Sequence, residues 1–424
     1  MNTTRRVFLG ASAAAIAQAG PNDTINLGVI GCGARGRTLI IPRFSKLPGV
    51  RVTAVCDVNS RHLADARERA GGEKVAAYRD YRKLLEDKNV DAVAIVTNQH
   101  WHVLPMIAAC QAGKDVYLEK PLGNSIGEGR FAIAAARKYN RIVQIGTQQR
   151  FQEHYRKAVE IIQSGRLGDI SQVKVWDYEN NAPGFGSPPD CPPPPELDWE
   201  FYVGPSPWRA YNPNIYYKYG YDWFQVSGGG HQVAWGVHHF DVVLWATGAR
   251  RPLKVTAMGG NHGFTDNREW PNTFSALAEF GPTPYAKHGF LLQYDMRVAG
   301  KREQRAHGKC FIGTEASMLL DRAGCSILEE PRRGAPPKPA EEIAPAADDN
   351  RAFEVFLENV RGRKQPFANL ETGHDATNVG HLMNVACQAG RAIRWDGETE
   401  KVIGDAEADR LVFKPYRAPW KLPA

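Results

Sequence analysis

Hydrophobic and polar residues follow one pattern over the first 150 positions of this 424-residue chain. Short, almost unbroken apolar runs, which are typical of strands buried in a parallel sheet, lie at 25–30, 51–57, 91–97, 115–121 and 141–149. Between them lie segments such as 60–70 and 125–139, where apolar residues recur at helical spacing. Repeated strand–helix units predict a doubly wound parallel sheet (α/β), whose ligand lies beyond the carboxyl ends of its strands.

From about residue 150 the pattern changes to β-rich runs separated by turns, which predicts a large, mostly antiparallel open sheet. These runs lie at 172–179, 254–260, 273–280, 289–296 and 309–320. Two proline-rich segments, 187–195 and 331–350, predict surface loops. Residues 350–362 and 374–394 have helical spacing, so this second region is expected to be α+β.

The first 20 residues have a composition of their own. Arg5 and Arg6 precede a short apolar run that ends in Ala17-Gln18-Ala19, which is typical of a secretory signal peptide. The adjacent arginines resemble a twin-arginine export signal. The run is shorter than the roughly 20 residues that span a bilayer, and no later segment is long and apolar enough. We therefore expect an exported, periplasmic protein without stable membrane insertion.

Charge and cysteine content restrict the partners. The net charge is +7, but acidic and basic residues are interspersed and no long run has a single sign, so nucleic acid is not favoured as a partner. The seven cysteines include no C-x-x-C pair. Few or no disulfide bonds are expected, because a chain of this length buries a core without them.

A glycine-rich sequence, GCGARG, follows the first predicted strand and opens a helix. In the order strand, G-x-G-x-x-G, helix, strand, acid, it predicts a dinucleotide site. Gly31 permits a tight turn, Gly33 lets a pyrophosphate approach, and Gly36 lets the helix lie close to the sheet. Asp57, at the end of the next strand, is placed to accept hydrogen bonds from ribose hydroxyls. This favours NAD over NADP, although nearby Arg61 weakens the preference.

Further polar residues lie at or beyond the ends of the predicted strands. Those expected to contact the cofactor are Ala34, Arg35, Thr97, Asn98, His100, Glu119, Lys120 and Gln148. His100 and His102 are equally compatible with a loop-capping role. Lys120 follows an apolar strand and precedes Pro121, which rigidifies the turn. An ammonium group held beside a nicotinamide could polarise a substrate carbonyl or lower the pKa of a substrate hydroxyl.

Aromatic residues are dense between Trp199 and Phe224. Their rings offer an apolar face and, in Tyr and Trp, a polar edge, which suits a sugar. For any single ring, packing against its aromatic neighbours is the alternative. We expect the cluster as a whole to line a substrate cleft.

Taken together, these motifs resemble the Gfo/Idh/MocA family of NAD(P)-dependent sugar oxidoreductases, over nearly the whole chain after the signal. The matching residues are GVIGCGARG, CDVN, IVTNQHWH, LEKPLG, QIGTQQR, DWEFYVGPSPWRAYNP, WGVHHFDVVLW and GHDATNVGHLMNVACQAGRAIRWD. The resemblance implies that substrate is held between the second sheet and the nicotinamide, and that Lys120 is catalytic. Members with open sheet faces commonly form homo-dimers or homo-tetramers. The resemblance also implies an acid/base histidine in the pattern D-x-G-x-H, which maps to His238. The aspartate of that pattern falls at Ala234.

The stretch GGGHQVAWGVHHFD contains this histidine in a predicted helix from Trp235 to Trp245. His238 and Asp241 share a helix face, so Asp241 could orient His238. His239 is turned by about 100° from its neighbour and cannot easily bind the same ion, so no metal site is expected. His231 is a candidate replacement for the missing carboxylate. The residues expected to contact substrate are His102, Arg150, Trp235 and His239.

The predicted organisation is a signal peptide at 1–20, an NAD-binding Rossmann domain at 21–148, and a substrate and oligomerisation domain at 149–424. Helices within 350–395 are expected to pack back. The leading hypothesis is an oxidoreductase that uses tightly bound NAD on a hydroxyl of a carbohydrate. One alternative is a redox-neutral, NAD-dependent glycoside hydrolase or lyase that works by transient oxidation and elimination. The other is a non-enzymatic NAD-binding sensor.

Overall fold

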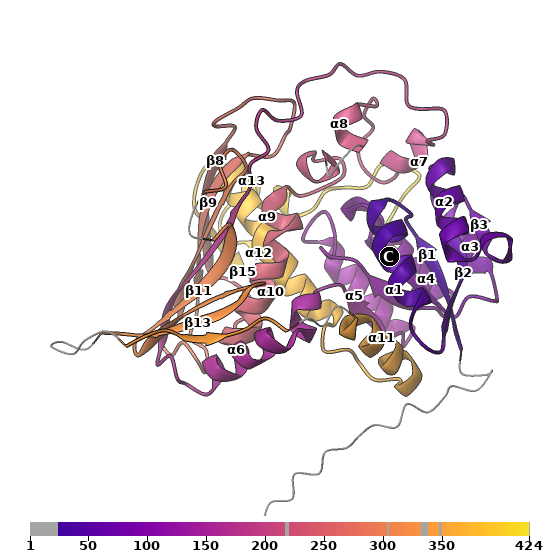
Figure 1. Cartoon of the computed structure of the whole chain (residues 1–424). Helices are drawn as coiled ribbons and strands as arrows, with labels where there is room; N and C mark the ends of the chain where they lie inside the picture. Colours follow the sequence, from indigo (N-terminus) through magenta and orange to yellow (C-terminus); the bar gives the residue numbers. More distant parts are fainter. Residues whose placement is uncertain (1–23, 217–219, 303–304, 332–337, 347–349, 424) are drawn as a thin grey trace, which may run out of the picture.

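The computed structural model describes residues 24–216, 220–302, 305–331, 338–346 and 350–423. The predicted signal peptide lies outside the described residues. Two sheets face each other across a layer of helices (Figure 1). Helices α9, α10 and α12 lie on the side of the large sheet that faces the N-terminal sheet, so the junction of the two units is built mainly from helix ends and loops.

The N-terminal sheet is six-stranded and entirely parallel, as predicted. Its strands are β1 (Ile25–Ile30), β2 (Val50–Cys56), β3 (Ala76–Tyr78), β4 (Ala92–Ile95), β5 (Asp115–Leu118) and β6 (Val143–Ile145). The order β3-β2-β1-β4-β5-β6 reverses direction between β1 and β4. Doubly wound sheets bind ligands beyond the strand ends at such a point.

Helices connect these strands in alternation. They are α1 (Ile41–Ser45), α2 (Ser60–Ala70), α3 (Tyr81–Glu86), α4 (Val103–Gln111) and α5 (Glu128–Lys138), and α6 (Glu153–Gln163) leads into the second sheet. A π-helical turn, Gly36–Ile40, precedes α1. The side chain of Asn59 accepts hydrogen bonds from the backbone N–H groups of Arg61 and His62 and so caps α2.

The second sheet has ten strands in the order β14-β13-β12-β11-β7-β10-β9-β8-β15-β16. Only the β7–β10 pair is parallel, so the sheet is mostly antiparallel as predicted. Its strands are β7 (Ile170–Tyr178), β8 (Lys254–Gly260), β9 (Thr273–Phe280), β10 (Phe290–Arg297), β11 (His307–Gly313), β12 (Ala316–Asp321), β13 (Gly324–Glu329), β14 (Glu341–Ile343), β15 (Ile393–Asp396) and β16 (Lys401–Val402). The predicted loop 331–350 thus contains the edge strand β14.

The helices of the second unit pack on both sheets. They are α7 (Trp199–Val203), α8 (Pro213–Tyr216), α9 (His231–Ala234), α10 (Gly236–Thr247), α11 (Arg351–Gly362), α12 (Leu370–Ala389) and α13 (Ala406–Asp409). Helix α11 returns to the N-terminal unit, where Phe353 packs edge-on against Phe44 with ring centroids 5.1 Å apart, and Phe356 lies 5.9 Å from Tyr117. The core of the first unit is therefore completed by a late segment.

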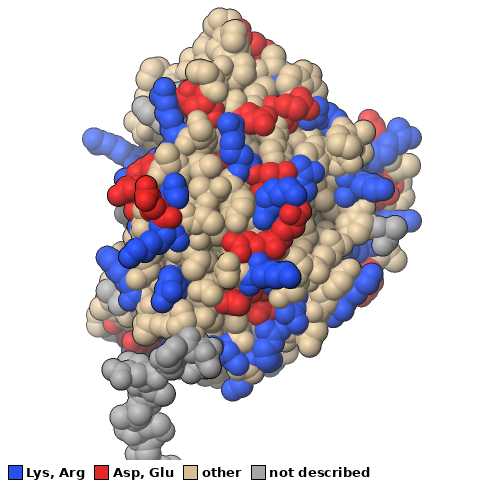
Figure 2. Space-filling model, turned by 90° about the vertical axis from the view of Figure 1, so that its right-hand side faces the viewer, with Lys and Arg blue, Asp and Glu red and all other residues tan. Residues whose placement is uncertain are grey.

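The surface carries charges of both signs. On the face shown in Figure 2, which is the side of the N-terminal unit, lysine and arginine are interspersed with aspartate and glutamate. Within the described ranges, no helix combines the length and the hydropathy needed to cross a bilayer. All seven cysteines are free thiols.

Candidate functional site

The glycine-rich loop between β1 and the first helical turn has the geometry that its spacing predicts. Gly31 has φ +91°, and a Cβ there would lie 2.7 Å from the backbone of Val96 and Thr97. A Cβ on Gly36 would collide with the carbonyl oxygen of Gly31. A Cβ on Gly33 would meet no atom within 4 Å. The outer glycines are therefore required by the fold, whereas Gly33 borders open space beside the helix start at Ala34.

Asp57 follows β2 and holds this loop in place. Its carboxylate accepts hydrogen bonds from the backbone N–H groups of Cys32 (2.6 Å) and Asn59 (2.7 Å). Burial raises the pKa of Asp57, and these hydrogen bonds oppose the shift. Arg61, in contrast, is highly exposed, and its guanidinium lies 3.1 Å from the carboxylate of Glu196.

The end of β5 brings Glu119 and Lys120 to the junction of the two units. Glu119 is buried and its carboxylate lies 2.6 Å from Nε of Arg35. Lys120 Nζ donates a hydrogen bond to the backbone carbonyl oxygen of Ala234 (2.7 Å). Burial lowers the pKa of Lys120, and the negative charge of Asp222 is the largest opposing influence. Ala234 therefore contributes a backbone oxygen at the position where a carboxylate was expected.

His238 lies on the first turn of α10 and is held neutral by its surroundings. Its side chain is buried, and burial followed by the positive charge of Lys120 lowers its pKa well below the usual value. His239, also buried, has its pKa lowered by burial and by Lys309. Within the described residues, Nδ1 of each ring has no hydrogen-bond partner. A neutral imidazole with an unpartnered nitrogen can accept a proton.

The expectation that Asp241 orients His238 is wrong. Nε of Arg150 donates to both carboxylate oxygens of Asp241, at 2.9 and 2.8 Å, and both side chains are almost fully buried. The Arg150 guanidinium also lies over the rings of Trp245 and Phe367. Arg150 is thus committed to this buried pair, and the prediction that it contacts substrate is not supported by its geometry.

The residues between β4 and α4 mainly fix loops. Both ring nitrogens of His102 face backbone carbonyl oxygens, those of Pro121 and Thr97, and the ring of His100 faces the carbonyl oxygens of Tyr202 and Ser227. Thr97 Oγ1 donates to the carbonyl oxygen of Trp101, and Asn98 donates to the Tyr202 hydroxyl. The structure thus gives both histidines the loop-capping role. Gln148 keeps a buried side-chain oxygen without a partner in the described part of the chain.

His231 is the member of the histidine stretch that pairs with a carboxylate. Its Nε2 lies 2.7 Å from a carboxylate oxygen of Asp177, which is buried on β7. Its ring stacks almost parallel to the indoles of Trp223 and Trp235, at 5.5 and 6.2 Å between centroids. Burial lowers the pKa of His231, but the pairing with Asp177 outweighs it, so the pKa is raised. Trp235 in turn packs edge-on against His238 at 5.6 Å.

Several residues of this site were missed by sequence reasoning. They are Asp177 on β7, Asp222, His307 and Lys309 on β11, and Arg322. Burial raises the pKa of Asp222 to about 6 and lowers that of Lys309 to about 7. A signal was present for two of them, because Asp177 continues the buried face of Val173 and Val175, and Lys309 shares the buried face of Phe311. A charged residue at a buried position of a strand is a candidate for a functional site.

The aromatic segment 199–224 mostly packs on itself. Trp199 stacks on Tyr202 at 4.9 Å and packs edge-on against Tyr211, and all three are buried. Trp208, with 55% of its surface exposed, is the exception among its large buried neighbours. Tyr217 and Tyr219 lie outside the described residues. The expectation that the cluster as a whole lines a cleft is therefore not met.

The residues present fit a dinucleotide. The open space at Gly33, the helix start at Ala34 and the buried, unpartnered Gln148 oxygen lie at the carboxyl ends of the parallel strands, where such a group binds. Across the described ranges no three His, Cys, Asp or Glu side chains gather as a metal-binding group.

Comparisons with known proteins agree with this geometry. Residues 25–147 match the model of an oxidoreductase family with an NAD-binding Rossmann fold, and residues 329–422 match its C-terminal alpha/beta domain. Myo-inositol 2-dehydrogenase of Thermotoga maritima is 29% identical over 175 residues, which are 41% of this chain and 48% of the relative. Inositol 2-dehydrogenase 2 of Saccharopolyspora erythraea is 33% identical over 170 residues, 40% of this chain and 48% of the relative. The chain thus spans about half the length of these relatives.

Solved structures show the same fold over more of the chain. The apo scyllo-inositol dehydrogenase of Lactobacillus casei has a TM-score of 0.61 at 20% identity, covering 88% of this chain and 98% of its own. The WlbA dehydrogenase of Bordetella pertussis, in complex with NADH and UDP-GlcNAcA, has a TM-score of 0.66 at 17% identity, covering 88% and 99%. With a parallel dinucleotide-binding sheet, a large second sheet and both family domains matched, this chain belongs to the Gfo/Idh/MocA family of oxidoreductases.

Proposed function

We propose that the protein uses NAD to oxidise a hydroxyl group of a sugar or cyclic polyol. The observation that carries this proposal is the neutral, partly unpartnered His238 beside the cationic Lys120 at the end of β5. The inositol dehydrogenases among the relatives support the substrate class. Asp57 supports NAD over NADP, because a buried carboxylate repels a 2′-phosphate.

The bound dinucleotide would supply the hydride acceptor. The loop at Gly33, the first helical turn and Asp57 would hold it. A ring nitrogen of His238 would take the hydroxyl proton, since the lowered pKa keeps the ring neutral. The Lys120 ammonium would polarise the same oxygen and stabilise negative charge that develops there.

Single substitutions test these roles. Lys120→Ala and His238→Ala should each lower kcat/KM for an identified polyol by about 100-fold or more, because general acid–base groups contribute about 10²–10⁴. His288→Ala and Lys401→Ala, at exposed positions, are the matched controls. Turnover would be followed by NADH absorbance over a panel of inositols, aldoses and uronates. Full turnover in both active-site variants would overturn the proposal.

The pH profile provides a second readout. Because the pKa of His238 lies well below its usual value near 6.5, the base is already unprotonated at neutral pH. The acid limb of kcat/KM should therefore lie below pH 6.5. A limb centred above pH 7 would assign the base to another group.

A second candidate is the redox-neutral glycoside hydrolase or lyase, and the His231–Asp177 pair favours it. Elimination of a glycosidic group needs an acid as well as a base, and the pKa of His231 is raised by Asp177 whereas that of His238 is lowered by burial. In this cycle the sugar is transiently oxidised, loses its leaving group, adds water and is reduced again. NADH would then not accumulate, and NAD would copurify and resist dialysis, as mass spectrometry can show. Stoichiometric NADH would exclude this cycle.

Two further properties belong to the proposal. Residues 1–20 would direct twin-arginine export, and replacing Arg5 and Arg6 by lysine should leave the protein in the cytoplasm on cell fractionation.

The outer face of the large sheet would form a homo-oligomer, because Met258, Leu277 and Leu291 are exposed there on neighbouring strands. Met258→Lys should shift the mass measured by light scattering to that of a monomer.

A further inference from the structure

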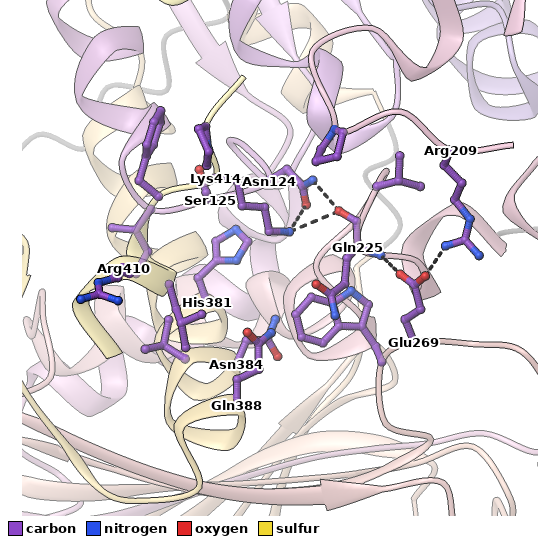
Figure 3. Close-up of a pocket in the computed structure, with 18 of the residues that line it drawn as sticks. Asn124, Ser125, Arg209, Gln225, Glu269, His381, Asn384, Gln388, Arg410 and Lys414 are labelled. Atoms are coloured by element: carbon purple, nitrogen blue, oxygen red, sulfur yellow. Dashed lines mark hydrogen bonds and ion pairs between the residues drawn. The ribbon is translucent and has the colours of Figure 1, made fainter. Parts of the chain in front are cut away.

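A cavity lies apart from the Lys120–His238 cluster. It has a volume of about 620 Å³, within the range of about 300–1,000 Å³ for small-molecule sites. Its walls come from the loop after β5, the face of α12 that carries His381, Asn384 and Gln388, and the C-terminal tail (Figure 3). The chemistry described above assigns no function to this cavity.

The charge of this cavity is unbalanced. The single carboxylate on its wall, Glu269, is already paired with Arg209 and accepts the backbone N–H of Gln225. Lys414 and Arg410 also line it, and neither makes an ion pair with a described residue. Lys414 Nζ makes only long hydrogen bonds of 3.3 Å, to the side-chain oxygen of Asn124 and the carbonyl oxygen of Gln225. The carboxylates whose negative charge acts on Lys414 are Glu128 and Glu269. Both already accept hydrogen bonds, Glu128 from the backbone N–H groups of Asn124 and Ser125 and Glu269 from that of Gln225. With Arg209 paired to Glu269, the remaining cations Lys414 and Arg410 favour an anionic ligand.

An unpartnered hydroxyl points to the same conclusion. Ser125 is 6% exposed, lines the cavity, and its Oγ has no hydrogen-bond partner among the residues that the structure describes. A buried polar atom of this kind is uncommon unless a ligand or water completes it. In Figure 3, Ser125 and the Lys414 amine lie on the same side of the cavity.

The remaining walls suit a polyhydroxylated ring. Trp208 offers an exposed indole, and Trp270, whose ring lies 5.6 Å from Lys414 Nζ, forms the wall near Gln225. On α12 the exposed Gln388 amide can donate to and accept from hydroxyl groups, whereas the buried Asn384 amide one turn earlier is already bonded to Gln232 and Gly229. Flat indole surface beside amide groups is the combination that matches the C–H face and hydroxyl rim of a sugar.

We propose that this cavity is a binding site for an anionic monosaccharide, a sugar ring that carries one carboxylate. The carboxylate pairs with Lys414 and Ser125, and the ring packs on Trp208. The site is separate from the catalytic centre, because the Gly228–Gly230 segment lies between them. The Trp270 indole donates to the carbonyl oxygen of Gly228, and the Asn384 amide to that of Gly229.

Calorimetric titration of the purified full chain without added NAD tests the proposal, with D-glucuronate, D-glucose and inorganic phosphate as probes. Glucuronate should bind saturably, and glucose at least 10-fold more weakly. Lys414→Met and Trp208→Ala should each weaken glucuronate binding by about 10-fold or more, whereas Lys421→Met, at an exposed tail position, should not. Burial lowers the pKa of Lys414 to about 8, so affinity should fall between pH 7 and pH 9 as the amine loses its proton.

Three outcomes would overturn the site. Equal binding of phosphate and glucuronate would reduce it to a general anion site. Loss of glucuronate binding in Lys120→Ala would place the ligand at the catalytic centre instead. Unchanged binding in Trp208→Ala and Arg410→Gln, both at exposed positions, would remove the sugar contact even where Lys414→Met fails to fold. Binding is measured without turnover, so these results are independent of the oxidoreductase proposal.

Discussion

His231 and His238 lie seven positions apart, and their pKa values are shifted in opposite directions. The nearest charge to His231 is the Asp177 carboxylate, whereas the charges around His238 are the cations Lys120, Arg322 and Arg35. Both rings are buried, so the sign of the neighbouring charge decides which ring keeps its proton. One short stretch therefore supplies a proton donor and a proton acceptor.

The Asp177–His231 pair gives a prediction for stability against pH. In Asp177→Asn the pKa of His231 should fall below its wild-type value, which imidazole NMR signals can follow. Because the folded-state pKa is raised, the pair stabilises the wild type fully below the unfolded value near 6.5. This contribution is lost as the pH rises through the folded pKa. An unfolding free-energy difference between the two proteins that grew with pH would contradict this account.

At the residue scale, the sequence was informative where spacing is local. The glycine positions and the places of Asp57 and Lys120 after their strands follow from motifs a few residues long. The hydrogen bonds of Asp57 to Cys32 and of Lys120 to Ala234 were not predicted. The partner of Asp241 could not be predicted, because Arg150 lies 91 positions away and reaches it only through tertiary packing. Asp222, whose charge acts on Lys120, lies in a single 3₁₀-helical turn, Gly220–Trp223, which is too short for a repeating pattern.

At the scale of the elements, two glycines of one loop have different roles: Gly36 is required for folding, and Gly33 is required for binding the dinucleotide. Gly36→Ala should destabilise the protein by about 1–3 kcal/mol, because its Cβ would collide with the carbonyl of Gly31. Gly33→Ala should keep the wild-type melting temperature, since its Cβ meets no protein atom. It should nevertheless weaken NAD binding by about 10-fold or more, measured by titration. Loss of folding in Gly33→Ala, or normal stability in Gly36→Ala, would reverse the two roles.

The contact between Arg150 and helix α10 is a buried ion pair, which gives a second prediction at this scale. Asp241→Asn should lower the free energy of unfolding by about 3–5 kcal/mol, because it leaves a buried guanidinium without its counter-charge. Glu86→Gln, which breaks the exposed pair with Lys83, should cost less than about 1 kcal/mol. Urea denaturation of the three proteins would measure both values. A small loss of unfolding free energy in Asp241→Asn would show that the ion pair does not stabilise the packing of α10.

Helices and strands themselves were largely predictable, and the exceptions have physical causes. The run 309–320 was predicted as one β segment, but it folds as the hairpin β11–β12, with Thr314 and Glu315 at the turn. The proline-rich segment 331–350 forms β14 over only three residues, at the sheet edge, where few ladder hydrogen bonds are needed.

For the whole molecule, the alternation of elements predicted both sheets, and helices within 350–395 were expected to pack back, but the surface that α11 covers was not predicted. Helix α11 lies in the chain between strands β14 and β15 of the large sheet and yet packs against Phe44 and Tyr117 of the N-terminal unit. Its amphipathic pattern predicts that one face of the helix is buried, but the pattern does not indicate which surface of the protein that face packs against.

This return of the chain predicts that the two units share their stability. Phe356→Ala should lower the free energy of unfolding by about 3–5 kcal/mol, since the ring is fully buried. The melting temperature and the affinity for NAD should fall together, although Phe356 is distant in sequence from the glycine loop. Leu253→Ala, at a half-exposed position, is the control. Unchanged NAD binding in a destabilised Phe356 variant would show that the units are independent.

The late arrival of α11 also has a consequence during synthesis. Ribosomes add about 5–20 residues per second, so the apolar surface around Phe44 and Tyr117 stays uncovered for roughly tens of seconds while the rest of the chain is made. Exposed apolar surface on a nascent chain is prone to aggregate and is the surface that chaperones bind. The core of the dinucleotide-binding unit is therefore completed only once residues 351–362 have been synthesised, and its uncovered surface can bind a general chaperone until then.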